Sequence, residues 1–155
     1  MKKIIAILIC LLMLLSISVF PVTAVEEKTT QTVEYLEDGS YIVTIIEETV
    51  THGARMNTTV GNKTRNCYSA NDVLQWKMTV TGEFQYDGTT SSCTYASGVI
   101  TVSNTSQWEA TSESAAVGDT TAYYSVTFAR WLLGVVVERP TYGVSISCDP
   151  DGNLY

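Results

Sequence analysis

The sequence lacks most of the side chains on which hydrolases and metal enzymes depend. It contains a single histidine, His52, and no spacing of histidine, cysteine and carboxylate residues that is typical of a metal site. A nucleophilic Cys67 would need a base to remove its proton, and nothing in the sequence places His52 beside it. We therefore predict that the protein is not an enzyme and binds neither a metal nor a cofactor.

Positive charge is also scarce. The chain has 9 Lys and Arg residues against 16 Asp and Glu residues. Nucleic acids and anionic lipid surfaces bind proteins through clusters of basic side chains, so this balance argues against both kinds of partner. Paired carboxylates, such as Glu47 and Glu48, point to opposite sides of an extended chain and are not a matched acid and base.

Long apolar runs are absent after the first 24 residues. The N-terminus has two lysines, an apolar stretch over residues 4–20 and a small residue at Ala24, which is the pattern of a cleavable secretory signal peptide. We expect a secreted protein whose mature part has 7 basic and 16 acidic side chains. The later apolar run, residues 131–137, is far shorter than the roughly 20 residues that span a bilayer, and it predicts a buried strand.

No stretch of ten or more residues has the apolar spacing of an amphipathic helix, whereas residues 74–87 alternate between apolar and polar side chains. A period of two places the large apolar groups on one face of a strand and the polar groups on the other. Gly82 alone interrupts the apolar series, and it leaves space for a bend, a bulge or a close neighbour. Trp76 lies on the apolar face and is expected in the core.

Turn sequences divide the rest of the chain into strands. Asp38-Gly39 predicts an N-terminal hairpin that lies in the main sheet or packs on it, and the Gly- and Asn-containing residues 52–66 predict a linker. We therefore divide the chain into a signal peptide (1–24), an N-terminal hairpin and linker (25–62) and a β domain (63–155). Later strands are expected at residues 64–69, 74–86, 91–96, 99–103, 108–114, 121–130, 133–138 and 142–148. The predicted class is all-β, with an antiparallel β-sandwich of immunoglobulin-like general shape favoured over a closed barrel.

Three cysteines remain after removal of residues 1–24, so an oxidising compartment is expected to leave one pair bridged and one thiol over. Cys148 shares the buried parity of its strand, and Cys93 follows the Asp87-Gly88 turn on the next strand. We predict a disulfide between Cys93 and Cys148, with Cys67 as a packed, spare or intermolecular cysteine.

Aromatic side chains provide the candidate ligand site. Trp108 and Trp131 lie where the alternation weakens, and Tyr123 lies on the polar parity of its strand, so these three are the predicted sugar- or peptide-binding residues, with a purely structural role as the alternative. Asp149, Asp151 and Asn153 have the spacing of a calcium loop, but the later carboxylate that completes such a site is missing, and Asp-Pro-Asp-Gly is a turn sequence on its own.

Several segments together resemble a group of small secreted proteins of Gram-positive bacteria, many of them from gut anaerobes. The segments are residues 73–88, Cys93, residues 37–41, residues 132–137, Cys148 and residues 152–154. The family is uncharacterised, so the resemblance implies secretion and a β domain and carries no functional residues across. We predict a monomeric extracellular domain that binds a protein or a glycan, with a carbohydrate-binding module as the alternative and a hydrolase as the least favoured function.

Overall fold

The computed structural model describes residues 25–51 and 57–155, and within these residues the chain forms nine strands and no helix. The predicted signal peptide and His52 lie outside the described residues. The strands are β1 (Val25–Tyr35), β2 (Tyr41–Thr51), β3 (Asn57–Tyr68), β4 (Leu74–Tyr86), β5 (Ser91–Val102), β6 (Trp108–Val117), β7 (Thr121–Leu132), β8 (Val135–Glu138) and β9 (Thr141–Ser147).

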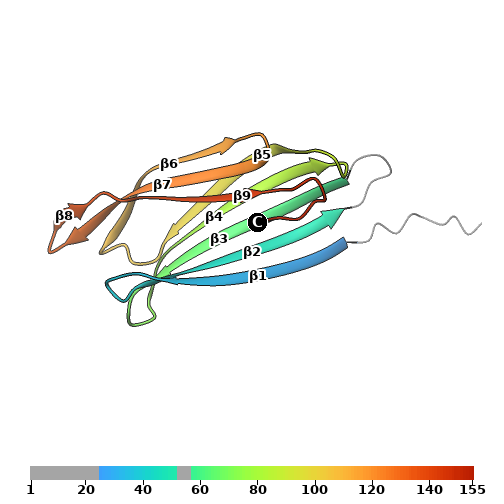
Figure 1. Ribbon diagram of the computed structural model, residues 1–155. Coiled ribbons are helices and arrows are strands. Elements are labelled where there is room, and N and C mark those ends of the chain that lie inside the picture. Colours follow the sequence, from blue (N-terminus) through green and yellow to red (C-terminus); the bar gives the residue numbers. More distant parts are fainter. Residues whose placement is uncertain (1–24, 52–56) are drawn as a thin grey trace, which may run out of the picture.

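The strands form two antiparallel sheets that pack face to face, which confirms the predicted β-sandwich (Figure 1). The first, called sheet A here, has the order β1-β2-β3-β4-β5, so five consecutive strands run up and down beside one another. The second, sheet B, has β7 at its centre, with β6 on one side and β8 and β9 on the other. Strands β3, β4 and β5 pack against sheet B.

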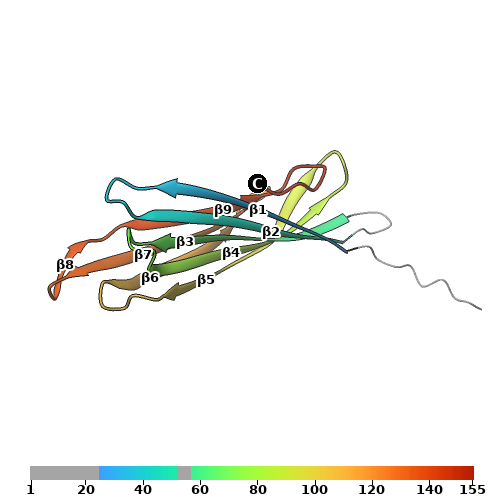
Figure 2. The ribbon, with the colours of Figure 1, turned by 90° about the horizontal axis from the view of Figure 1, so that it is seen from below.

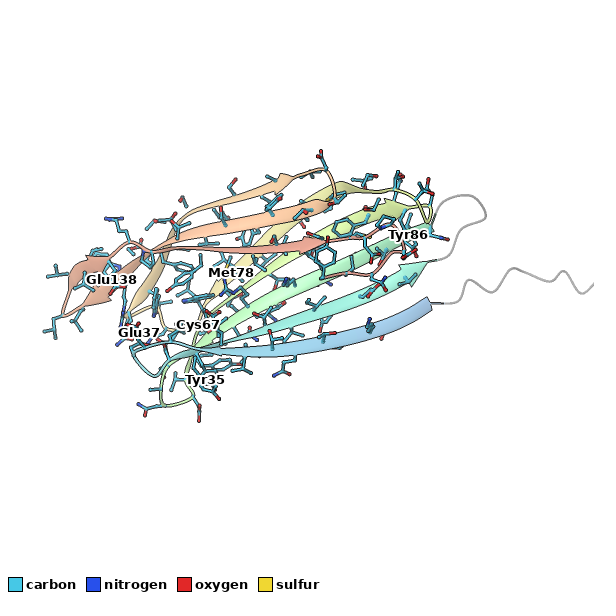
Figure 3. The ribbon with its side chains drawn as sticks, viewed as in Figure 1. Tyr35, Glu37, Cys67, Met78, Tyr86 and Glu138 are labelled. Carbon is cyan, nitrogen blue, oxygen red and sulfur yellow. The ribbon has the colours of Figure 1, made fainter. Side chains whose placement is uncertain are left out.

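The alternating strand β4 supplies the centre of the core, as its sequence predicts. Trp76, Met78, Val80 and Phe84 are each at most 1 % exposed, and Figure 3 shows Met78 between the two sheets. The facing row comes from alternate residues of β7 and β9: Ala122, Tyr124, Val126, Phe128, Val144 and Ile146 are all buried. Two inward apolar rows, one from each sheet, therefore close the sandwich.

Two glycines on the inner face of sheet A leave room for side chains that cross the core. A Cβ on Gly82 would lie 2.6 Å from the ring of Phe84 and 2.9 Å from Cβ of Ala122 on β7, so the predicted notch holds a close neighbour. A Cβ on Gly98 would lie 2.0 Å from the ring of Tyr124. Gly98 pairs with Val80 on β4 and does not form the predicted turn. Residues 91–102 are therefore one strand, β5, where the sequence predicted separate strands at 91–96 and 99–103.

The predicted linker is wrong over residues 57–63, which belong to β3 between β2 and β4, whereas the strand predicted at residues 64–69 forms the rest of β3. Its polar side chains are accommodated because threonine and asparagine bond across neighbouring strands: Thr64 Oγ1 lies 2.9 Å from Thr79 Oγ1, and Thr81 Oγ1 donates to Asn62 Oδ1 at 2.7 Å. Such cross-strand pairs stabilise a sheet without large apolar groups. The N-terminal hairpin therefore lies in the main sheet, joined to it through β3.

Strands β1 and β2 extend sheet A beyond the strands that sheet B covers, as Figure 1 shows. Arg65 on β3 connects this extension to sheet B, because its guanidinium donates to the backbone oxygen of Gly143 on β9 at 2.8 Å and forms an ion pair with Glu34 on β1 at 3.4 Å. Every side chain from Glu27 to Tyr35 is exposed. The hydrogen-bonded ladder to β2 is thus the main structural attachment of β1.

Candidate functional site

A cleft of about 470 Å³ opens where β6 leaves the β5–β6 loop and passes the end of β7. Its lining is mostly apolar, with hydroxyl and carboxylate groups among the residues around it. We call it the tryptophan cleft; it is lined by Val102, Thr105, Ser106, Trp108, Glu109, Ala110, Trp131 and Gly134. The structure thus brings together Trp108 and Trp131, two of the three predicted ligand-binding residues.

Trp108 forms the inner wall of the cleft and is largely committed to the core. Its side chain is 7 % exposed, and its ring meets those of Trp76 and Phe128 edge to face, with centroids 6.4 and 5.7 Å apart. The guanidinium of Arg130, on β7, lies 5.6 Å from the centroid of the Trp108 ring, a distance suited to a cation–π contact. Little of the Trp108 ring surface remains for stacking on a sugar.

Trp131 is the more accessible of the two tryptophans. It is the second-last residue of β7, and the register between β7 and β8 shifts between Arg130 and Trp131. Its indole Nε1 donates to a carboxylate oxygen of Glu109 at 3.2 Å, which orients the ring, and both residues line the cleft. A ligand in the cleft would therefore meet an oriented indole beside a carboxylate and an apolar floor.

Tyr123 does not belong to this site. It is 48 % exposed near the start of β7, eight residues before Trp131, which places the two roughly 26 Å apart along the strand. Its cross-strand neighbours are Ala116 and Ser145. The three predicted residues therefore do not form one aromatic platform.

The prediction of a buried strand over residues 131–137 is wrong. Leu133 (φ 50°) and Gly134 (φ 80°) form a tight two-residue turn, which folds the run into a hairpin that projects beyond the sandwich (Figures 1 and 2). We call residues 132–137 the hairpin tip. Leu133 is 96 % exposed, and Leu132, Val135 and Val137 are about half exposed or more. Figure 3 places Glu138 at this projecting end, and its carboxylate pairs with Arg130 at 3.4 Å.

The hairpin tip was not predicted because a short apolar run has the same composition in a core strand and in an exposed hairpin. The available signal was the glycine at position 134, since glycine readily adopts the positive φ that such a turn requires. Sequence reasoning also missed a row of tyrosines on the outer face of sheet A, where Tyr41 contacts Tyr35 and Tyr68 with centroids 5.7 and 5.1 Å apart.

The predicted disulfide is absent: Cys93 and Cys148 are free, buried thiols, as is Cys67. The backbone amides of Cys93 and Cys148 donate to the neighbouring oxygens of Asp119 and Thr120, so one turn holds both strands. Burial raises the pKa of Cys67 to about 11 and that of Cys148 to about 12. A thiol with such a pKa is protonated at neutral pH, which is the less nucleophilic form.

The segment with calcium-like spacing is a turn whose carboxylate is already used. Asp149 Oδ1 accepts hydrogen bonds from the amides of Asp151 and Asn153 at 2.9 and 2.8 Å, and Asn153 Nδ2 donates to Asp149 Oδ2. The hydrogen bonds from Asn153, chiefly the one from its side chain, lower the pKa of Asp149. Among the described residues, no group of three or more His, Cys, Asp or Glu side chains is placed to hold a metal ion.

Comparison with known proteins finds no matching family model, no matching curated protein and no matching solved structure. The described part of the chain contains no helix that is long and apolar enough to cross a membrane. The resemblance to small secreted Gram-positive proteins stays a prediction.

Proposed function

We propose that this protein is a secreted, non-catalytic domain that binds another extracellular protein through the hairpin tip and the adjoining tryptophan cleft. The observation that carries the proposal is the exposure of four large apolar side chains, Leu132, Leu133, Val135 and Val137, on a projecting hairpin. Soluble proteins rarely expose contiguous apolar surface of this kind, and where they do it commonly marks a binding site.

The charges around the hairpin tip favour a protein over a lipid surface. Glu138 and Glu109 lie near the apolar residues together with Arg130 and Arg139, and Arg130 is paired with Glu138. The tip therefore lacks the cluster of basic side chains that attracts an anionic membrane, and the acidic balance of the whole chain adds repulsion. A convex apolar hairpin bordered by hydrogen-bonding groups is instead suited to an apolar groove on a folded partner.

The state of Cys67 supports a function without catalysis. The thiol is 4 % exposed, and its high pKa keeps it protonated near neutrality. The groups that act on it electrostatically are Asp38, which raises its pKa, and Arg65 and Arg130, which lower it. None of these is a general base that could activate a thiol at neutral pH.

Carbohydrate binding is the second candidate, and the orientation of Trp131 is the observation that favours it. The indole is fixed by Glu109 and borders a cleft whose neighbouring residues include Thr105 and Ser106. A single pyranose ring could stack on Trp131 while its hydroxyls bond to these groups. The buried Trp108 and the distant Tyr123 leave no extended platform for a longer chain of sugars.

Photo-crosslinking tests the proposed function. A photoreactive phenylalanine analogue is placed at Leu133, and as a matched control at Val99, which is 65 % exposed on β5. On the surface of the producing cells, position 133 is expected to give one discrete protein adduct that an excess of wild-type protein suppresses and the Leu132→Asp variant does not. Equal adducts from both positions, or none from position 133, would contradict the proposal.

Two further binding measurements separate the alternatives. Retention on a glycan array that Trp131→Ala abolishes and Leu133→Asp preserves would establish the carbohydrate function instead. Sedimentation with phosphatidylcholine–phosphatidylglycerol vesicles that Leu133→Asp abolishes would show that the tip binds lipid, and would overturn the argument from charge.

A further inference from the structure

Sheet A ends at β1 with an edge that no strand covers among the described residues. Over all eleven residues β1 pairs with β2 in one unbroken register, from Val25 opposite Thr51 to Tyr35 opposite Tyr41. The strand contains no proline and its ladder has no bulge. A long, regular edge of this kind is a template for another strand, and natural proteins usually protect such edges.

The other sheet edges carry bulges, short strands or backbone contacts that β1 lacks, while β1 carries the exposed charges Glu27, Lys28 and Glu34. β6 has a bulge between Ala110 and Ser112, and β8 is only four residues long. The backbone of Tyr155 pairs with that of Ser147 at one end of β9, and the Arg65 guanidinium donates a hydrogen bond to the Gly143 oxygen in the same strand. On β5, the Cys93 amide donates to Asp119. The contrast indicates that the β1 edge is kept open for pairing.

The hydrogen bonding of the hairpin identifies which backbone groups face outward. The Leu36 amide donates to the Ser40 oxygen at 2.8 Å, so Leu36 and Ser40 form a hydrogen-bonded pair. In an antiparallel ladder the hydrogen-bonded pairs alternate, and the amide and carbonyl of every second residue therefore point away from β2. The outward residues of β1 are Glu27, Thr29, Gln31, Val33 and Tyr35.

We propose that two copies of this protein form a symmetric dimer in which the β1 strands pair antiparallel about a two-fold axis at Gln31. Gln31 then faces Gln31 of the second copy, and Thr29 faces Val33, all through outward backbone groups. In this register Lys28 of each copy lies opposite Glu34 of the other, on the same face of the sheet. The two sheets A become one continuous ten-stranded sheet, with an isologous interface.

Charge complementarity selects this register. Moving the two-fold axis to Thr30 or Thr32 places Lys28 opposite Thr32 or Leu36 and removes both ion pairs. Each charge also has a neighbour inside its own chain, since Lys28 lies opposite Glu48 on β2 and Glu34 pairs with Arg65 on β3. Pairing across the edge therefore extends an existing row in which positive and negative groups alternate.

The surroundings of β1 leave room for a second copy. The strands that pack on sheet B are β3, β4 and β5, so sheet B lies away from the β1 edge (Figure 1). The hairpin tip projects at the end of β7, so the dimer interface and the proposed binding surface are separate. The proposed dimer differs from the monomer that the sequence analysis predicts, and the experiments below decide between them.

Charge reversal tests the dimer. The two variants are Lys28→Glu, which places Glu opposite Glu34 at both ends of the interface, and Glu34→Lys, which places Lys opposite Lys28. Sedimentation equilibrium over a wide concentration range is expected to show that the wild type dimerises and that each variant alone dissociates roughly tenfold more readily. A one-to-one mixture of the two variants restores both attractions, so it is expected to form heterodimers at about the wild-type affinity.

A backbone variant, Gln31→Pro, provides the second test. It removes an outward amide at the two-fold axis while the inward amides that bond to β2 remain, and edge strands tolerate proline at such positions. It is expected to abolish dimerisation and to keep the circular dichroism spectrum of the wild type. A wild-type protein that stays monomeric at every concentration, a mixture that stays monomeric, or a Gln31→Pro protein that still dimerises would each overturn the proposal.

Discussion

β4 and β1 are both long strands of sheet A, yet they are stabilised in different ways. β4 has neighbours on both edges, and its inner face is buried under sheet B. β1 has a neighbour on one edge, and its side chains from Glu27 to Tyr35 are exposed. Burial of apolar area stabilises β4, whereas β1 depends on backbone hydrogen bonds and on the Arg65–Glu34 pair. One sheet thus contains a core-forming part and a part suited to interaction.

Removal of a core ring from β4 is expected to have the largest effect. Trp76→Ala deletes a fully buried side chain that contacts Phe128 and Tyr142, and we expect the free energy of unfolding to fall by about 3–5 kcal/mol. The matched change on β1, Val33→Ala, is expected to cost less than about 0.5 kcal/mol because Val33 is exposed. Urea unfolding measures both, and similar losses would show that the two strands contribute equally.

Adding a side chain at Gly98, where the ring of Tyr124 packs on the backbone, is expected to have the next largest effect on stability. The new Cβ in Gly98→Ala would overlap the ring of Tyr124, whose hydroxyl bonds to Glu113, so the ring cannot shift freely. We expect a loss of about 1–3 kcal/mol. Gly143→Ala in β9 is the control, because the nearest atom to its Cβ lies 3.9 Å away. Unchanged stability of Gly98→Ala would show that the sheets are less closely packed there.

The buried thiols make the stability of the core depend on pH. The pKa of Cys67 is about 11 and that of Cys148 about 12, against 9.0 for an unperturbed thiol. A raised pKa favours the protonated native form, so this contribution to stability is full below pH 9 and is lost as the pH rises toward 12. The Cys67→Ala, Cys148→Ala double variant is expected to lose less stability over the same range.

Thiol counting on residues 25–155 checks the redox state that this prediction assumes. Alkylation of the native protein at pH 8 is expected to be slow, and the unfolded chain is expected to show all three thiols. A single reactive thiol after unfolding would mean that two of the cysteines are bridged.

Substitution at the hairpin tip is expected to have the smallest effect on stability. Leu133→Asp changes a side chain that is 96 % exposed, so the free energy of unfolding is expected to change by less than about 0.5 kcal/mol. Thermal unfolding measures this. A loss as large as that of a core residue would mean that the tip packs against the protein, and would remove the basis for a binding role.

The comparison also explains which features the sequence could predict. The period of two in β4, β7 and β9 predicts their buried faces because one face of each strand lies between the two sheets and must be apolar. The second part of β3 was predicted as the strand at residues 64–69, but residues 57–63 were assigned to a linker. Threonine and asparagine pairs stabilise β3 between β2 and β4, and such residues leave no apolar alternation. In the site, Trp108 and Trp131 were predicted, but only the folded chain places them at one cleft and Tyr123 far away. The hairpin tip could not be told from a core strand by composition.

Native-state hydrogen exchange tests most directly the claim that sheet A has a closed, core-forming part and an open part. At a dilution that favours the monomer, the amides of Thr30, Thr32 and Glu34, which face β2, are expected to exchange through local opening. The amides of Met78 on β4 and Val126 on β7 are expected to exchange only through global unfolding, at least about a hundredfold more slowly. Equal protection of β1 and β4 would contradict this account.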